Sequence, residues 1–339
     1  MSQPAGKTDG EGGQKVLVTV VIPAFRARRY LPEALASVRA QSYSSWEVVV
    51  VDDCSPEPVD DLVSAFAATV SGNRVRLIRH SENKGLGATR NTGILAANGE
   101  YIAFLDHDDI WRETHLEDAI AAMESEAAGL VYCDCEMFRE KAGDLPKVPV
   151  VKAQTEGAFP ASLYMHNSTA PSGVVMRKRV LEELKLFATD PEIHMCEDMD
   201  LWLRAAGHGV KVARVPKANL LYRKHPESAT SNPRLISEAK AHAIHRNLHT
   251  LSQVPFSLRL KRTRIVCAEA ARYNGLENPA KAAYFYGLSV RTNPRLERVW
   301  IKHLLAFLFY RTMSLFRPMP SGSQFANKQN GSSIPGQRV

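Results

Sequence analysis

Three carboxylates follow a short apolar segment, and their spacing is typical of a divalent cation site. Residues 101–105 are largely apolar and predict a buried strand that ends at Asp106, Asp108 and Asp109. Because side chains alternate along an extended chain, we expect Asp106 and Asp108 to point the same way. Converging carboxylates repel each other unless a cation lies between them, and a hard divalent ion also bound by substrate phosphates would fill that position. The alternative is a solvated acidic turn that begins the helix expected after Trp111.

The elements that must position these carboxylates alternate between strands and helices. Apolar runs predict strands over residues 16–22, 46–51, 75–78 and 101–105. Helical spacing of apolar residues predicts helices between them, over residues 29–41, 59–69 and 85–97. Strands and helices that alternate with short connections predict an α/β fold, a mostly parallel sheet with helices on both faces.

Polar or conformationally special residues follow the other predicted strands as well. The first strand stops at Pro23 and Ala24, and the second runs directly into Asp52 and Asp53. The third leads through a Gly-rich turn to Arg90. Since such sheets bind ligands at the carboxyl ends of their strands, we expect this chemistry to converge on one edge. The two aspartates could instead cap the helix that follows them.

The pattern is looser in the second half of the chain. Short strands are predicted over residues 130–133, 172–177 and 220–223, with a loop over 140–157. A helix is predicted over 197–206, opened by acidic residues. From about Ser237 onward the sequence reads as basic helices, with a packed helix pair over 268–290. The last twenty or so residues and the first fifteen predict disordered tails.

The charge distribution distinguishes two regions. The formal net charge is +7, yet residues 1–240 hold 28 Lys and Arg against 33 Asp and Glu, whereas residues 241–339 hold 15 against 3. This asymmetry predicts regions with different partners. Five cysteines without metal-site spacing and a polar N-terminal segment without an apolar stretch favour a reduced, cytoplasmic protein. No uncharged apolar run approaches the roughly 20 residues that span a bilayer.

Six short motifs, taken in chain order, resemble glycosyltransferase family 2, whose members have the Rossmann-like GT-A fold. The motifs lie at residues 20–25, 50–55, 83–91, 105–109, 197–204 and 222–228. Each is weak alone, and their shared order carries the resemblance, which covers about residues 16–230. It implies a GT-A catalytic domain over residues 16–236, with a nucleotide-binding half at 16–110 and an acceptor-binding half at 111–236. The remaining predicted divisions are a tail at 1–15, a basic helical extension at 237–318 and a tail at 319–339.

The resemblance also implies roles for residues of the donor site. Pro23 and Ala24 would line the nucleotide pocket through backbone contacts. Asp52 or Asp53 would accept a hydrogen bond from the base, which gives specificity because an unpaired buried carboxylate is costly.

Other members of the site are implied in the same way. Arg90 and Lys84 would face the base or its ribose, and Asp106 would lie near the ribose and the metal. Asp108 would bind the Mn²⁺ or Mg²⁺ that holds the diphosphate. His225 resembles a histidine that completes the metal shell in part of the fold class, with an ordinary surface histidine as the alternative.

Asp198 resembles the catalytic base, and its chemistry fits that role independently. An acceptor hydroxyl is a poor nucleophile and must lose its proton as it attacks the anomeric carbon. A positioned carboxylate contributes roughly 10²–10⁴-fold to such a rate. One base opposite the leaving group implies a single displacement with inversion. The alternative is that Glu197 and Asp198 only complement a helix dipole.

The sequence therefore predicts a metal-dependent inverting glycosyltransferase with a nucleotide-sugar donor, expected to be a UDP-sugar. The expected acceptor is a hydroxyl of a glycan or lipid-linked saccharide in cell-surface polysaccharide synthesis. One alternative is a sugar-nucleotide nucleotidyltransferase, although residues 23–27 lack the glycines which that class places after the first strand. A second is a nucleic-acid-binding module, against which the acidic front and the lack of interleaved aromatics in the basic tail both argue.

The basic tail carries a further expectation. A helix over residues 301–315 would place Ile301, Leu304, Leu305, Leu308 and Leu315 on one broad face, with Lys302, His303 and Arg317 opposite. Such a helix can lie in a membrane interface and be attracted to anionic lipids. We therefore expect peripheral association with an anionic membrane at its cytoplasmic face. The alternative is that this face packs on the catalytic domain as ordinary core.

Overall fold

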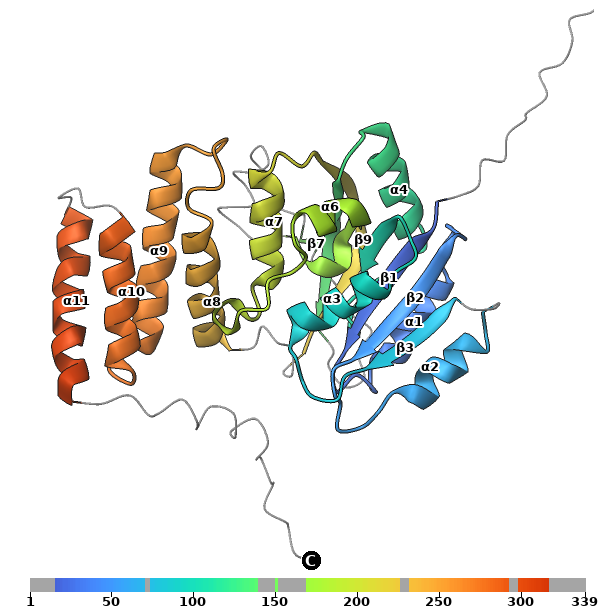
Figure 1. Ribbon diagram of the computed structural model, residues 1–339, viewed down its shortest axis with the longest axis horizontal. Coiled ribbons are helices and arrows are strands. Elements are labelled where there is room, and N and C mark those ends of the chain that lie inside the picture. The colour runs from blue at the N-terminus through green and yellow to red at the C-terminus, as the bar shows by residue number, and fades with distance from the viewer. Residues whose placement is uncertain are drawn as a thin grey trace, which may run out of the picture. The chain divides into compact units, whose positions relative to one another are not determined.

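The computed structural model describes residues 16–70, 74–139, 150–151, 169–225, 232–292 and 298–316 (Figure 1). The chain divides into two compact units. Unit 1 comprises Met1–Ser231 and His249–Val254, and unit 2 comprises Asn232–Leu248 and Pro255–Val339. The predicted domain boundary after residue 236 lies close to the first of these divisions.

Among the described residues of unit 1, nine strands form a mixed central sheet, and its order along the main path is β3-β2-β1-β4-β8-β6-β9-β5, with β7 beside β6. The strands are β1 Val18–Ala24, β2 Trp46–Asp52, β3 Val75–Arg79, β4 Tyr101–Phe104, β5 Ile110–Trp111, β6 Leu130–Arg139, β7 Val150–Val151, β8 Val174–Arg177 and β9 Val212–Lys224. The first four strands pair in parallel, as predicted. Strand β8 runs antiparallel to β4 and β6, whereas β6 and β9 are parallel.

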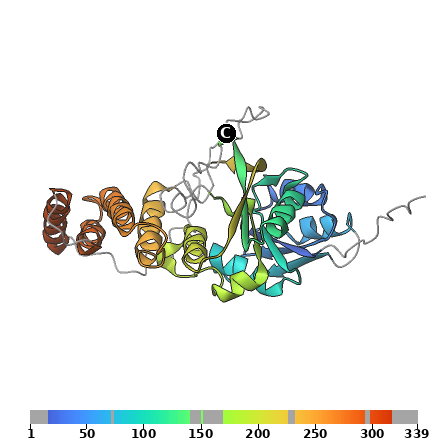
Figure 2. The same cartoon turned by 90° about the horizontal axis from the view of Figure 1, so that it is seen from above.

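Helices cover both faces of this sheet, which confirms the predicted layers (Figures 1 and 2). They are α1 Leu31–Arg39, α2 Asp60–Ala67, α3 Leu86–Ala96, α4 His115–Ser125, α6 Lys178–Glu183 and α7 Glu197–Gly207. Alternate residues of β1 point to opposite sides. Val20 and Ile22 pack in one core with residues of α1, α2 and α4. Val21 lies against Gly93 of α3, on the other side.

Two strands extend beyond the residues that their apolar patterns predicted. Strand β6 continues to Arg139 and β9 begins at Val212, and the two form one long parallel ladder with an irregularity after Cys133. Arg214 and Lys217 in β9 interrupt the apolar pattern, so the sequence signal covered only the last part of that strand. The predicted loop over 140–157 contains β7, and the rest of it lies outside the described residues.

Unit 2 consists of helices α8 Pro233–Arg246, α9 Phe256–Asn274, α10 Pro279–Thr292 and α11 Arg298–Phe316, each packed against the next (Figure 2). This confirms the helical C-terminal region. Buried alanines lie on both α9 and α10 and allow close packing, among them Ala271 and Ala282. None of the five cysteines, all of which lie in described segments, forms a disulfide bond. In the part of the chain that the structure describes, no helix combines the length and the apolar character needed to cross a bilayer.

Candidate active site

The ends of the parallel strands meet at one edge of the sheet. Ala24 lies beside Asp52, and Asp52 lies beside Arg79 in the strand register. The chain stays paired beyond these positions, because the Asp53 N–H donates to the Ala24 carbonyl at 2.8 Å. The predicted convergence of the first three strand ends is therefore present in the structure.

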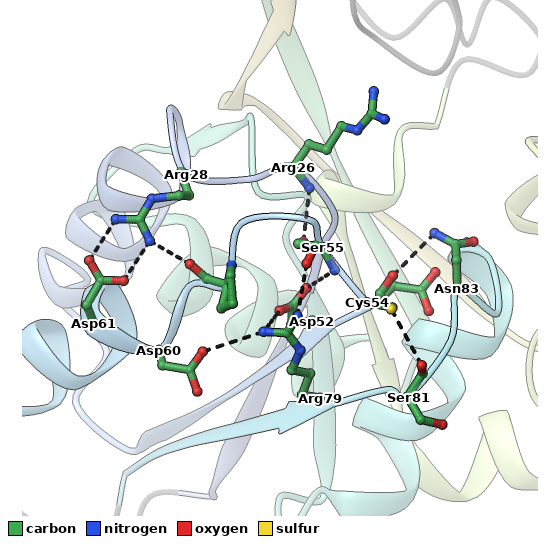
Figure 3. A network of polar contacts seen from close by, with 12 residues as sticks. Arg26, Arg28, Asp52, Cys54, Ser55, Asp60, Asp61, Arg79, Ser81 and Asn83 are labelled. Atoms are coloured by element: carbon green, nitrogen blue, oxygen red, sulfur yellow. Dashed lines mark hydrogen bonds and ion pairs between the residues drawn. The ribbon is translucent and has the colours of Figure 1, made fainter. Parts of the chain in front are cut away.

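Asp52 is a buried group of this edge. Its Oδ1 accepts a hydrogen bond from the Ser55 N–H at 2.9 Å, and the Arg79 guanidinium lies 3.5 Å from Oδ2 (Figure 3). Oδ2 has no hydrogen-bond partner among the described residues. The Ser55 hydroxyl in turn accepts from the Arg26 N–H at 3.1 Å. Asp52 thus fixes Ser55, and Ser55 links the loop after β2 to the loop after β1.

The Asp53 carboxylate binds backbone N–H groups at the start of α3. Its Oδ1 accepts from the Lys84 N–H at 2.8 Å and contacts His80 Nδ1 at 2.7 Å, and its Oδ2 accepts from the Gly85 N–H at 2.9 Å. Gly85 has φ +83°, a conformation that favours glycine. The alternative that these aspartates cap α2 is not supported, because α2 begins after Val59 without a side-chain cap.

The turn after β4 carries Asp106, Asp108 and Asp109, which we call the acidic motif, and we call the turn itself the acidic turn. The strand ends at Phe104, and the Asp109 N–H donates to the Asp106 carbonyl at 3.1 Å, which closes a turn. The expectation that Asp106 and Asp108 point the same way assumed an extended chain, and that assumption is wrong because the chain turns at this point. The His107 ring contacts the Pro23 carbonyl at 3.2 Å and links this turn to the end of β1.

The two carboxylates of the motif have different partners. Asp106 Oδ1 accepts from Arg90 at 2.7 Å, whereas Asp108 Oδ2 lies 2.9 Å from His225 Nε2. His225 is largely buried and packs beside the Tyr30 ring. The structure thus brings Asp108 and His225 together, as a shared ligand role requires.

A network around Asp109 was missed by the sequence reasoning. Asp109 is buried and accepts from the Ser172 hydroxyl at 2.6 Å and from the Arg223 N–H at 2.9 Å. Burial, reinforced by the charges of Asp108 and Asp106, raises the pKa of Asp109 well above its usual range. One feature of the sequence could have indicated it. Asp109 is the third carboxylate of the motif and directly precedes the apolar pair Ile110 and Trp111, which form the next strand.

Ser172 and Arg223, which lie elsewhere in the sequence, also bind the backbone of this turn. The Ser172 hydroxyl accepts from the Asp106 N–H at 3.0 Å, and Arg223 Nε donates to the Asp108 carbonyl at 2.8 Å. The acidic motif is therefore fixed by the short 3-10 turn Pro171–Gly173 before β8 and by β9.

Asp198 lies in the first turn of α7. Its carboxylate is half-buried and accepts from the Met199 N–H at 2.6 Å. Burial and the adjacent Glu197 raise its pKa to about 7, and the positive charge of Arg90 opposes that rise. A carboxyl group that titrates near neutral pH is suited to accept a proton during catalysis.

Arg90 joins α7 to the acidic turn. Its side chain is 1% exposed, and its two terminal nitrogens donate to Glu197 at 2.6 Å and to Asp106 at 2.7 Å. Its guanidinium also lies 5.4 Å from the centre of the Phe187 ring. Its predicted contact with the base or ribose stays a prediction, as does that of Lys84, whose side chain is exposed.

The residues fit a divalent cation that shares its shell with a ligand. Among the described residues, no three side chains of the metal-binding types are grouped closely enough to hold an ion by themselves. The Asp108 and His225 pair supplies two donors, and a hard cation commonly completes its shell with substrate phosphates and water. Asp106 is engaged by Arg90, so its role as a direct ligand stays a prediction.

Comparison with known proteins supports the same family. The model of glycosyl transferase family 2 matches residues 19–184. An uncharacterized glycosyltransferase of Haemophilus influenzae is 30% identical over 228 residues, 63% of this chain and 68% of that protein. Escherichia coli WfaP, named as a UDP-Glc:α-D-GlcNAc-diphosphoundecaprenol β-1,3-glucosyltransferase, is 27% identical over 216 residues, 64% of this chain and 80% of WfaP. Bacillus subtilis TuaG, named for teichuronic acid biosynthesis, is 31% identical over 133 residues, 39% of this chain and only 52% of TuaG.

Solved structures agree on the fold. Residues 1–349 of S. aureus TarS in complex with UDP match with a TM-score of 0.63 at 18% identity, over 90% of this chain and 92% of that one. The Pyrobaculum calidifontis mannosyltransferase PcManGT, solved with GDP-Man and Mn²⁺, matches with a TM-score of 0.53 at 19% identity, over 89% and 88%. From its motifs, its sheet and these relatives, the chain belongs to glycosyl transferase family 2 and is a glycosyltransferase with the GT-A fold.

Proposed function

We propose that this enzyme transfers a sugar from a UDP-sugar to a hydroxyl of a lipid-linked saccharide or growing glycan, with inversion, in cell-surface polysaccharide synthesis. The observation that carries the proposal is the arrangement of Asp198, whose pKa is about 7, on the helix that Arg90 ties to the acidic turn. A proton acceptor and a diphosphate-binding turn must be held together for a single displacement. Family membership argues against the nucleotidyltransferase alternative.

Each residue has a task in this reaction. Pro23, Ala24 and the loop held by Asp52 would line the base and ribose, while Asp53 keeps α3 in place. Asp198 would accept the proton of the attacking hydroxyl. As it does so, its own negative charge would be neutralised, while negative charge would develop on the diphosphate that departs from the opposite face of the sugar.

Asp108 and His225 would hold a Mn²⁺ or Mg²⁺ ion together with the diphosphate. A divalent ion bound there would supply positive charge that stabilises the leaving group. PcManGT, which has the same fold, was solved with Mn²⁺. In this chain, Arg223 holds the Asp108 carbonyl and Ser172 holds the Asp106 N–H, so the backbone of the turn is kept in position for that contact.

The donor and acceptor are suggested by relatives. TarS was solved with UDP and with UDP-GlcNAc, and WfaP is named for a UDP-glucose donor and a diphosphoundecaprenol-linked acceptor. A lipid-linked acceptor would place the reaction at a membrane, which agrees with the expected attraction of the basic C-terminal region to anionic lipids.

A panel of nucleotide-sugars tests the proposal. Each donor is incubated with Mn²⁺, with Mg²⁺ or with a chelator, and release of nucleoside diphosphate is measured. We expect UDP-sugars to be turned over only when a divalent ion is present. Equal turnover with the chelator would contradict the metal, and exclusive turnover of a GDP-sugar would contradict the donor.

A further inference from the structure

Helix α11 is fixed on one side by α10. His303 Nδ1 lies 2.8 Å from the Ser289 hydroxyl of α10. A Cβ placed on Gly287 would lie only 3.0 Å from the Phe307 ring, so this glycine lets the two helices approach closely. The prediction that His303 lies opposite the apolar face is therefore supported, since it points toward α10.

The other side of α11 presents apolar side chains to solvent. The exposed residues lie four, three and seven positions apart, a spacing that keeps them on one side of the helix, and form what we call the outer stripe, Ile301, Leu305, Leu308 and Leu315. Their exposed fractions run from 44% to 79%, and Phe309 beside them is 52% exposed. Leu304, which we expected on this face, is half-buried. A contiguous apolar face of this kind on an otherwise packed helix indicates an interaction surface.

The charges around the outer stripe restrict its partner. The sequences of α10 and α11 contain five Lys and Arg residues and no aspartate or glutamate. Lys302 and Arg311 are exposed beside the stripe. A second copy of α11 would bring basic residues against basic residues, which disfavours self-association through this face. An anionic surface would be complementary to it.

A cavity next to the outer stripe also combines apolar walls with basic side chains. It has a volume of about 410 Å³ and is lined by Tyr284, Gly287, Val290, Arg291, Phe307 and Arg311. Its walls are aromatic and aliphatic, and its charged members are two exposed arginines. Guanidinium groups bind phosphate oxygens through paired hydrogen bonds, while the apolar walls suit a hydrocarbon chain. The chemistry that matches both is an anionic lipid.

We propose that α10 and α11 form a docking surface for a bilayer that contains anionic phospholipids. The outer stripe enters the interface, and Arg291 and Arg311 bind lipid phosphates at the cavity between the helices. The proposal rests on the proposed function in one respect, since a lipid-linked acceptor places the reaction at a bilayer. The surface itself belongs entirely to unit 2 and uses no residue of the candidate active site.

Vesicle co-sedimentation of the full chain tests this surface. We expect pelleting with vesicles of phosphatidylcholine and phosphatidylglycerol at low salt, less at high salt, and little with phosphatidylcholine alone. The variant Arg291→Gln/Arg311→Gln should partition roughly 30-fold more weakly, because each basic residue near an anionic surface contributes about fivefold. The variant Leu305→Ser/Leu308→Ser should lose at least roughly tenfold.

The matched control is Arg39→Gln/Arg179→Gln, which makes the same change of net charge at two exposed positions of unit 1. We expect it to bind vesicles like the unchanged protein. Far-UV circular dichroism and thermal unfolding confirm that each variant is folded. Activity with a water-soluble acceptor should be equal in all four proteins, because the docking surface lies outside the candidate active site.

Three outcomes would overturn the proposal. The full chain does not pellet with anionic vesicles, or both unit 2 variants pellet like the control, or the leucine variant converts a dimer into a monomer in light scattering without altering vesicle binding. The last result would assign the stripe to a second copy of the chain. The vesicle assay contains no nucleotide-sugar, so a failure of the proposed reaction would leave its result unchanged.

Discussion

At the residue scale, the proposed chemistry depends on the ionisation of Asp198. Catalysis requires its carboxylate form, and its raised pKa of about 7 means that the proton is bound below neutral pH. We therefore expect kcat/KM to be constant above pH 7 and to fall about tenfold per pH unit on the acid side. A profile that stays flat down to pH 5 would show that another group limits the reaction.

The substitution Asp198→Asn removes only the proton acceptor. We expect normal UDP binding and a loss of roughly 10²–10⁴-fold in transfer, with the acid limb of the pH profile abolished. Isothermal titration measures the first and single-turnover kinetics the second. A variant that keeps more than about a tenth of the wild-type turnover would exclude Asp198 as the base.

The paired position of Asp108 and His225 leads to a second expectation. Asp108→Ala and His225→Ala should each weaken UDP binding in the presence of Mn²⁺ by at least roughly tenfold, and should have little effect when a chelator is present. Titration calorimetry with and without the ion separates these effects. Asp61→Ala, which changes an exposed carboxylate of α2, serves as the control. If the two variants bind UDP like this control, the pair does not hold the metal.

Arg90 should behave as a positioning residue. Its 1% exposed side chain pairs with Glu197 and Asp106, and Arg90→Met would leave two carboxylates without their cation, at a cost of about 3–5 kcal/mol of folding free energy. Arg90→Lys can reach one partner but not both, and should lower kcat more than it raises KM. Arg28→Lys, at an exposed ion pair with Asp61, should change neither quantity. Equal kinetic effects of the two lysine variants would contradict the assignment.

The individual residues were predicted unevenly from the sequence. Asp198, Asp108 and His225 were proposed as site residues because their motifs have recognisable order and spacing, and their roles stay predictions. The pairing of Arg90 with Glu197 was not predicted, because Glu197 lies 107 positions away and only the fold brings the two residues together. The buried network of Asp109 was missed because its partners Ser172 and Arg223 lie 63 and 114 positions away, and because a turn rather than an extended strand determines where that carboxylate points.

At the element scale, the close approach of α3 to β1 depends on Gly93. A Cβ at this position would lie 2.4 Å from Val21 Cγ1, and the β-branched valine has little freedom to move. We expect Gly93→Ala to destabilise the protein by about 1–3 kcal/mol despite the better helix propensity of alanine. Urea denaturation measures the effect. In a double-mutant cycle, Val21→Ala should recover part of the loss, and strict additivity would show that the two side chains do not conflict.

The accuracy of the predicted elements follows from their burial. Strand β2 is buried along its whole length, so its uninterrupted apolar run marked it clearly. Strand β9 alternates between buried and exposed positions and contains Pro216, which hid its first half. Sheet order was not predictable beyond the first four strands, because the antiparallel insertion of β8 next to β4 leaves no local signal.

At the scale of the whole molecule, a short segment returns to unit 1 between two helices of unit 2. Within residues 249–254, Leu251 and Val254 are buried, and Thr250 packs against Gly207 of α7. Leu251→Ala should therefore destabilise unit 1 by about 2–5 kcal/mol. Thermal unfolding with and without UDP and Mn²⁺ identifies the transition of unit 1, which the ligands should raise.

The control for this substitution is Leu276→Ala, which changes a leucine that is 54% exposed in unit 2. It should leave the ligand-sensitive transition unchanged. If Leu251→Ala also leaves it unchanged, the segment does not contribute to the stability of unit 1, and a catalytic domain that ends at residue 236 would be sufficient.

Because the Arg90 guanidinium binds both Glu197 and Asp106, the conformational entropy of ordering these groups is lost during folding and not during catalysis. A side chain held by carboxylates from two distant segments loses its freedom once, when the chain folds, and not at every turnover. The acidic turn and the first turn of α7 are then already in register when a donor arrives, so little binding energy is consumed in reorganising them. Donor and acceptor would need to supply only their own loss of translational and rotational freedom.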